Sequence, residues 1–192
     1  MSGESVRIRP THPDDLDAVA AIYAHYVLNS VATFDEVPPS PEDWRAKAYD
    51  LYARRLPFLV AEADWEVVGF AYAAPWRPKP AYRHTAEDSI YLSPDHTGKG
   101  LGKALLTTLM PLCADAGVRR LLAVIADGGD DNSSSRLHKA IGFTEVGRLH
   151  EVGRKFDRWI DTVLYQLELR PRQVPPGEPV AEPPAGPAPR PE

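Results

Sequence analysis

Apolar and polar residues show two periodicities near the start of the chain, one typical of a strand and one typical of a helix. Residues 6–9 alternate with a period of two, which is typical of a strand with one buried face. Thr11 and Asp14 then have the spacing of a capping box, which predicts the start of a helix. The apolar residues of this helix recur three or four positions apart, at Leu16, Val19, Ala20 and Tyr23. A second helix is predicted from the N-cap Ser40 to about Arg54, because a proline occupies its first position.

The rest of the apolar pattern predicts short strands and two further helices. These elements are a hairpin of residues 58–61 and 67–72 about a polar turn at 62–66, a strand at 89–92, a helix from 101 to about 115, an apolar strand at 121–125, a short helix from the Asn132 cap to Gly142, and strands within 143–152 and 158–169. The order β-α-α-β-β-β-α-β-α-β-β predicts an α/β fold with a central mixed, mostly antiparallel sheet flanked by helices.

The composition predicts one domain and a tail. Residues 1–170 are enough for a single domain with a sizeable core, and 43% of all residues are hydrophobic. Residues 171–192 contain nine of the twenty prolines and no aromatic residue. This tail is predicted to be disordered or polyproline II, and a proline-motif ligand for another protein is the alternative.

Charge and cysteine content exclude several classes of protein. A net charge of -5 without a long Lys/Arg run argues against a nucleic-acid-binding protein. The lack of an apolar leader and of any 18-residue apolar run predicts a cytoplasmic protein with no membrane association. The single Cys113 falls on an apolar helix face, so its predicted role is core packing. The histidines lack metal-site spacing, and no metal is predicted.

A glycine-rich stretch, SPDHTGKGLGKAL, joins the strand at 89–92 to the next helix. It lacks the Walker pattern, since Thr97 stands at the first glycine position and Ala104 follows Lys103, and its glycine spacing does not fit a dinucleotide fingerprint. Glycines permit positive φ and a close approach to a ligand, and the helix start offers unpaired N–H groups to a phosphate. A tight turn with solvated lysines is the alternative.

The glycine stretch resembles the core motif of the GNAT superfamily of acetyl-CoA-dependent N-acetyltransferases, Gln/Arg-x-x-Gly-x-Gly/Ala before a helix. Here Thr97 stands at the Gln/Arg position, and His138 stands where the family has a tyrosine between its Asn and Gly-Phe. The resemblance to the phosphinothricin N-acetyltransferase branch covers about residues 5–169, and it rests further on Thr33-Phe34, Pro75-Trp76-Arg77, Tyr82, Thr85-x-Glu87, Leu137-His138 and Gly153-x-Lys155-x-x-x-Trp159-x-Asp161.

The resemblance implies acetyl-CoA as co-substrate, with its pyrophosphate on the glycine stretch. The residues expected to contact it are Leu92, Ser93, Thr97, Gly98, Lys99, Gly100, Leu101, Gly102, Lys103 and Asn132. A backbone N–H near Leu92 is expected to bind the oxyanion, because the family's strand parts from its neighbour there. The family also implies a homodimer, with the aromatic stretch 155–159 near the contact, and an exposed hairpin tip is the alternative.

The resemblance also implies roles for individual side chains. Glu87, just before the strand at 89–92, is the expected base for the ammonium, and a surface carboxylate is the alternative. His138 is expected to protonate the leaving thiolate or to accept the amine proton, against a histidine on the helix surface. The residues expected to bind the acceptor are Arg77 and Lys79, which face its carboxylate, and Phe34 and Tyr82, which wall its pocket. For Arg77 and Lys79, a solvated basic turn is the alternative.

Together these features predict an N-acetyltransferase for a small-molecule amine acceptor. The implied acceptor is a small amino acid analogue such as phosphinothricin or methionine sulfoximine. Transfer to another amine or a protein N-terminus is a close alternative, and a catalytically silent coenzyme A-binding module is an alternative of a different class.

Overall fold

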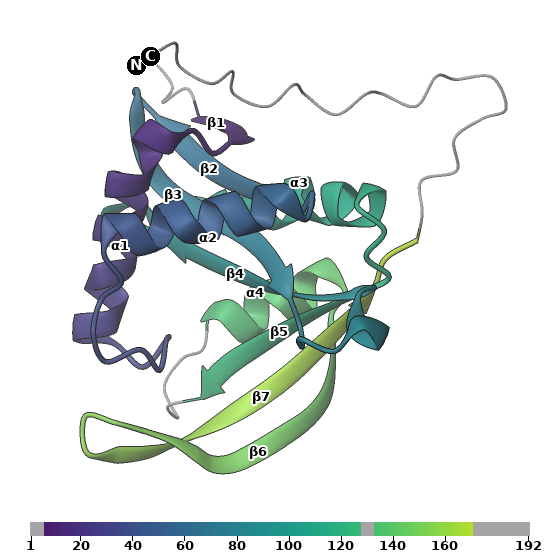
Figure 1. Ribbon diagram of the computed structural model, residues 1–192. Helices are drawn as coiled ribbons and strands as arrows, with labels where there is room; N and C mark the ends of the chain where they lie inside the picture. Colours follow the sequence, from purple (N-terminus) through teal and green to yellow (C-terminus); the bar gives the residue numbers. More distant parts are fainter. Residues whose placement is uncertain (1–5, 128–132, 171–192) are drawn as a thin grey trace, which may run out of the picture.

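The computed structural model describes residues 6–127 and 133–170, which form one α/β domain (Figure 1). The predicted Pro-rich tail at 171–192 and the predicted cap Asn132 lie outside the described residues. Within these residues, no helix is long and apolar enough to span a membrane.

A seven-stranded sheet forms the centre of the domain, in the order β1-β2-β3-β4-β5-β7-β6. Neighbouring strands are antiparallel except β4 and β5, which are parallel. The strands are β1 (Val6–Pro10), β2 (Phe58–Ala63), β3 (Glu66–Pro75), β4 (Thr85–Leu92), β5 (Arg120–Asp127), β6 (Thr144–Lys155) and β7 (Arg158–Glu168). The helices are α1 (Leu16–Asn29), α2 (Pro41–Ala53), α3 (Leu101–Asp115) and α4 (Ser133–Ile141). The predicted order of elements and the predicted fold class are confirmed.

The helices cover the two faces of the sheet and divide the core into two clusters (Figure 1). On one face, α1 and α2 bury Val19, Trp44 and Leu51 against Phe58 and Phe70 of the sheet. On the other face, α3 buries three leucines and a cysteine, namely Leu105, Leu106, Leu109 and Cys113. The predicted core role of Cys113 is therefore confirmed.

Three local predictions need correction. The capping box at the first helix is formed by His12 and Asp15 rather than by Thr11 and Asp14, because a short 3-10 turn precedes α1 and moves the cap by one residue. The turn between β2 and β3 is shorter than expected, because positive φ at residues 64 and 65 closes a tight hairpin. The strand predicted at 89–92 begins at Thr85 and therefore contains Glu87.

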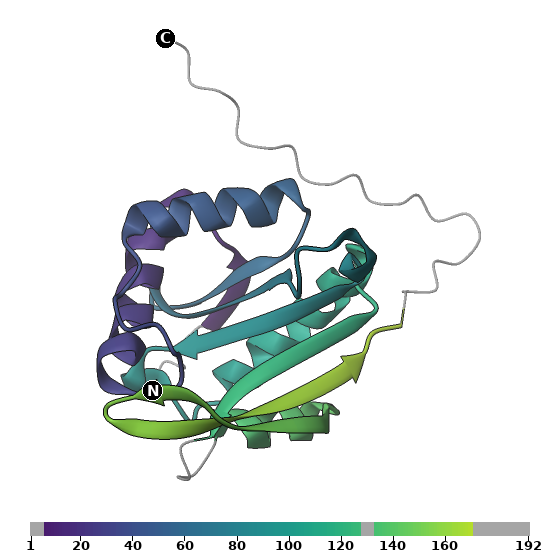
Figure 2. The same cartoon turned by 60° about the horizontal axis from the view of Figure 1, so that its bottom comes forward.

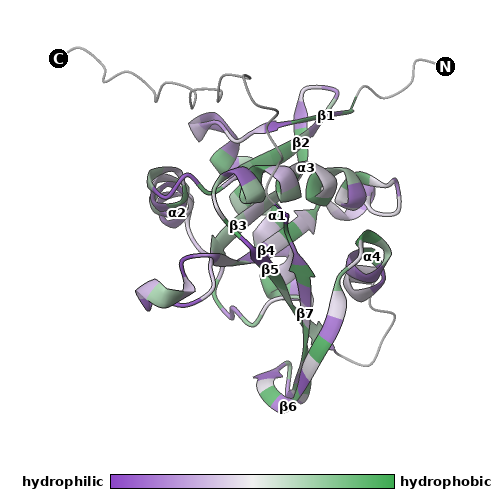
Figure 3. Cartoon of the chain, turned by 90° about the vertical axis from the view of Figure 1, so that its right-hand side faces the viewer, coloured by the Kyte–Doolittle hydropathy of each residue, from purple (hydrophilic) through white to green (hydrophobic). Residues whose placement is uncertain are grey.

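The hairpin of β6 and β7 extends past the sheet toward the loop between α1 and α2 (Figure 2). The buried Lys155 donates its Nζ hydrogen bond to Thr33 O at 2.8 Å. Gly153 lies so close to the ring of Phe34 that an added Cβ would clash with it. Several residues of this hairpin are hydrophobic (Figure 3). Those with exposed side chains include Val146, Leu149, Val152, Phe156 and Trp159.

Candidate active site

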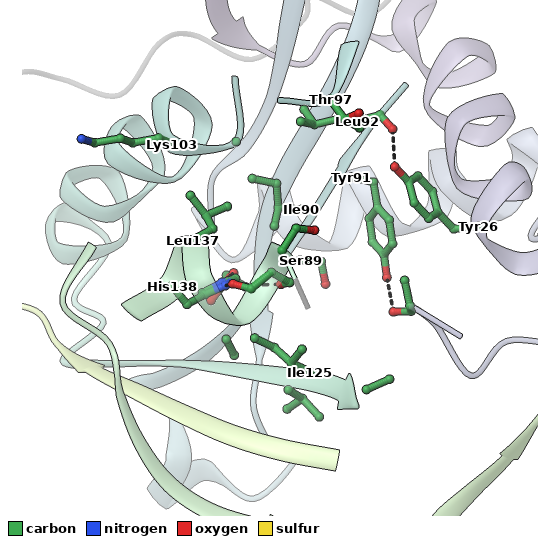
Figure 4. A pocket seen from close by; sticks show the side chains of 18 of the residues that line it. Tyr26, Ser89, Ile90, Tyr91, Leu92, Thr97, Lys103, Ile125, Leu137 and His138 are labelled. Atoms are coloured by element: carbon green, nitrogen blue, oxygen red, sulfur yellow. Dashed lines mark hydrogen bonds and ion pairs between the residues drawn. The ribbon is translucent and has the colours of Figure 1, made fainter. Parts of the chain in front are cut away.

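A cleft of about 420 Å³ opens where β4 and β5 separate (Figure 4). The two strands pair only over three residues, 85–87 with 120–122, after which β5 continues alongside β7. The resulting gap is closed by the glycine stretch and the start of α3 at one end and by α4 on one side. The lining residues include Glu87, Asp88, Leu92, Thr97, Gly100 and His138.

The separation leaves backbone groups of β4 without a strand partner. Trp76 N–H bonds to Thr85 O, and Ser93 N–H bonds to Val68 O at 2.8 Å, so the odd-numbered residues of β4 turn their backbone groups toward β3. The N–H groups of Ile90 and Leu92 therefore point to the other side, into the gap beside β5. The sheet thus supplies hydrogen-bond donors to a ligand in the cleft.

The glycine stretch forms a sharp turn at the end of this gap. Gly98 and Gly100 have φ of 73° and 82°, and a Cβ on either would meet no protein atom within 4 Å. Both therefore leave open space next to the first N–H groups of α3, which have no partner within the helix. Gly102 serves packing instead, because its Cβ would lie 3.0 Å from Leu137.

Most of the residues predicted to contact the cofactor meet at the cleft. Its lining contains Leu92, Thr97, Gly98, Gly100, Gly102 and Lys103. Ser93 and Lys99 are outside this lining, and Leu101 is buried in the core beneath the helix. A coenzyme with a pyrophosphate fits the remaining set, because the stretch offers backbone donors, helix N–H groups and room for close approach.

Glu87 is half-buried on β4, opposite Ala74 of β3. Its side chain lies on the α1 and α2 face, because strand residues alternate and Tyr91 packs against that core. Burial and the charge of Asp88 raise the pKa of Glu87 to about 7, while Arg77 and Lys47 act in the opposite direction. A carboxyl group with this pKa can accept or release a proton at neutral pH.

His138 lies on the opposite face and forms a buried pair with Asp88. Its Nε2 lies 2.9 Å from Asp88 Oδ2, and its Nδ1 lies 2.7 Å from Ser134 O. The Ser134 carbonyl can only accept, so Nδ1 carries a proton, and Nε2 shares a second hydrogen bond with the Asp88 carboxyl group. Burial lowers the pKa of His138, but the hydrogen bond and charge of Asp88 and the Ser134 carbonyl raise it above the usual value. Since both ring nitrogens are engaged, a proton-transfer role for His138 stays a prediction.

The residues predicted to bind the acceptor are spread around the Glu87 side. Arg77 stacks on Trp76 and acts on Glu87 through its charge. Lys79 and Tyr82 lie at an exposed 3-10 turn, and Phe34 packs against Gly153. In the described part of the chain, none of the four lines the cleft.

The sequence analysis did not identify Asp88 or Lys47 as site residues. Asp88 and Ala86 lie two residues apart on the same buried face of β4. Once the start of the strand is known, this period of two predicts a buried carboxylate at Asp88 that needs a partner. Its Oδ1 has no hydrogen-bond partner among the described residues. Lys47 carries no comparable sequence signal, because a lysine on an amphipathic helix is usually solvated.

The fold and cleft are those of an α/β acyltransferase. The chain matches the Acetyltransferase (GNAT) domain family over residues 8–164, and it belongs to this family. It is 47% identical over 162 residues to a phosphinothricin N-acetyltransferase of Alcaligenes faecalis, covering 84% of this chain and 82% of the relative. It is therefore an acetyl-CoA-dependent N-acetyltransferase.

Two further relatives agree with this assignment. An L-methionine sulfoximine/L-methionine sulfone acetyltransferase of Pseudomonas aeruginosa is 37% identical over 174 residues, covering 90% of this chain and 99% of the relative. The crystal structure of a GNAT superfamily phosphinothricin acetyltransferase from Sinorhizobium meliloti in complex with acetyl-CoA superposes with a TM-score of 0.81 at 40% identity. That match covers 89% of this chain and 96% of the other.

Asp88 is expected to tune the proton affinity of Glu87. In Asp88→Asn, the negative charge is lost while an oxygen remains to accept the Nε2 hydrogen bond of His138. The pKa of Glu87 is therefore expected to fall below about 7. Carbon-13 NMR of the Glu87 carboxyl across pH, on the ligand-free protein, measures this. The exposed Asp95→Asn serves as control, and an unchanged Glu87 titration in Asp88→Asn would contradict the prediction.

Proposed function

We propose that the protein transfers the acetyl group of acetyl-CoA to the amino group of a small amino acid analogue of the phosphinothricin or methionine sulfoximine type. The observation that carries this proposal is Glu87, a half-buried carboxyl group with a pKa of about 7. It lies in the last residue pair before β4 and β5 separate. The acceptor type comes from the relatives, which are phosphinothricin and methionine sulfoximine acetyltransferases.

The two substrates bind on opposite sides of β4, acetyl-CoA in the cleft and the acceptor beside Glu87. The pyrophosphate of acetyl-CoA binds the glycine stretch and the start of α3, and the thioester lies along the gap beside β4. The acceptor amine approaches from the Glu87 side, with its carboxylate toward Arg77 and Lys79. Phe34 and Tyr82 close the acceptor side.

In the reaction, Glu87 accepts a proton from the acceptor ammonium, directly or through water. The neutral nitrogen then attacks the thioester carbon, and the oxyanion accepts a hydrogen bond from Leu92 N–H. The carbon–sulfur bond breaks as the amide forms, and the nitrogen releases its second proton as coenzyme A leaves as a thiol. His138 lines the cleft and keeps its predicted role in this step, which is to protonate the leaving thiolate or to accept the amine proton.

Replacement of Glu87 is expected to lower the turnover rate without a comparable change in acetyl-CoA affinity. Glu87→Gln keeps the size of the side chain but loses the proton acceptor, so turnover is expected to fall by about 10²- to 10⁴-fold with nearly unchanged acetyl-CoA affinity. Thiol release and calorimetry measure the two quantities, and the exposed Glu66→Gln is the control. Higher pH is expected to narrow the deficit, because more of the amine is neutral. A wild-type rate in Glu87→Gln, with chemistry rate-limiting, would move the base role to another group.

The open space beside Gly100 allows a test of pyrophosphate binding by the glycine stretch. In Gly100→Val, a branched Cβ occupies the space next to the helix start, and acetyl-CoA affinity is expected to fall about 10- to 100-fold. Gly117→Val is a matched control, because Gly117 has φ of 86° and an equally open Cβ position but lies outside the cleft lining. Calorimetry giving equal affinities for the two folded variants would argue against pyrophosphate binding at this loop.

The exposed side chains of the β6–β7 hairpin support a homodimer. Its apolar residues are typical of an interface core, and a symmetric pair would cover them. Light scattering at micromolar concentration is expected to give about twice the chain mass of 21.2 kDa. Leu149→Asp is expected to lower that mass, whereas Trp65→Asp, at an exposed turn elsewhere, is expected to leave it unchanged. A wild-type mass near that of one chain would exclude the dimer.

A further inference from the structure

Lys47 is a cation held in a fixed position on the acceptor side of the sheet. Its Nζ donates a hydrogen bond to the Tyr72 hydroxyl at 2.9 Å. The same ammonium lies 4.6 Å from the ring centroid of Tyr72 and 5.0 Å from that of Trp44. Two ring faces and one hydroxyl therefore orient the side chain, and two of its three N–H donors are left for other acceptors.

Two carboxylates, Asp43 and Asp35, line the same cavity as Lys47, and both accept hydrogen bonds from other groups. Asp43 lies one helical turn before Lys47, where an ion pair is common, but its Oδ2 accepts hydrogen bonds from Ser40 N and Oγ at 2.8 and 2.7 Å. Asp35 accepts the hydroxyl of Tyr23 at 2.8 Å. Among the described residues, no carboxylate lies within 4.0 Å of Lys47 Nζ. The Lys47 charge therefore acts on Glu87 without a direct ion pair, and its ammonium can bind an anion from solution.

Lys47 also borders free volume on this side of the sheet. It lines a second cavity of about 380 Å³ together with residues of α1, α2 and the loop that joins them. Tyr23, on the wall of this cavity, packs edge-on against Tyr91, which lines the main cleft, with 4.9 Å between ring centroids. The packed rings of Tyr23 and Tyr91 therefore lie between the space beside Lys47 and the main cleft.

The strand register places Glu87 between two cations. Tyr72, which holds Lys47, precedes Ala74 by two residues on the same face of β3, and Ala74 is the partner of Glu87. Arg77 follows just beyond the end of β3. Both Lys47 and Arg77 are close enough to lower the pKa of Glu87 against the effect of burial. An acceptor amine at Glu87 therefore has a cation on either side along the strand.

We propose that Lys47 binds an oxyanion at the end of the acceptor side chain, while Arg77 faces the α-carboxylate. This inference rests on the proposed function and refines its substrate class. The preferred acceptor is then an α-amino acid whose side chain ends in an anionic group, as the phosphinate of phosphinothricin does. An uncharged sulfone or sulfoximine gains less from the ammonium, because a charge-assisted hydrogen bond is about twice as strong as a neutral one.

The test compares an anionic and an uncharged acceptor on one variant. In Lys47→Met, the KM for phosphinothricin is expected to rise about 10- to 100-fold, with kcat changed by less than about threefold. The KM for methionine sulfone is expected to stay within about twofold. The assays are run near pH 9, roughly two units above the Glu87 pKa of about 7, so that Glu87 is ionised in every variant. Calorimetry of phosphinothricin binding in the presence of coenzyme A gives a readout that needs no turnover.

Two further variants make the result specific to position. Arg45→Met removes a positive charge from an exposed site on the same helix and is expected to change neither KM. Tyr72→Phe removes the hydroxyl that holds Nζ and is expected to raise the phosphinothricin KM by a smaller factor than Lys47→Met. Equal changes for both acceptors in Lys47→Met, or no change for phosphinothricin, overturn the inference. If the wild-type protein acetylates neither acceptor, the proposed acceptor type itself fails, and the calorimetric comparison still decides whether Lys47 binds the anion.

Discussion

The site depends on one constraint, the early separation of the parallel strands β4 and β5. They share three residue pairs and then diverge, while β5 stays paired with β7 along its whole length. The gap exposes the backbone donors of Ile90 and Leu92, places Glu87 at its closed end and brings the start of α3 to its open end. A continuous ladder would bury all three features, since paired strands lie about 4.8 Å apart.

Two successive carboxylates on β4 have different partners because a strand turns alternate side chains to opposite faces. Asp88 pairs with the buried His138 against α4, whereas Glu87 faces the cations of α2 and of the loop after β3. The buried pair costs solvation, and it holds α4 against the cleft wall. Burial, together with the Asp88 charge, raises the pKa of Glu87 to about 7. One short strand thus separates the cofactor side from the acceptor side.

The loop that approaches the acceptor side is held by the distant β6–β7 hairpin. Lys155 bonds to the backbone of Thr33, and Gly153 gives the space that the Phe34 ring occupies. A residue in the last third of the chain therefore sets the position of a loop near its start. The same hairpin carries the exposed apolar residues, so assembly and acceptor binding involve neighbouring surfaces.

The sequence by itself determined the order of elements, the glycine turn and the family, because periodicity, caps and positive-φ glycines are local properties. It also pointed to Glu87 and His138, although the strand was expected to start after Glu87. Only the tertiary structure decided that His138 pairs with Asp88, fifty residues away, and that Lys47 lies over Tyr72. These contacts join residues from separate elements, so their pairing follows from strand register and helix packing, which no local pattern encodes.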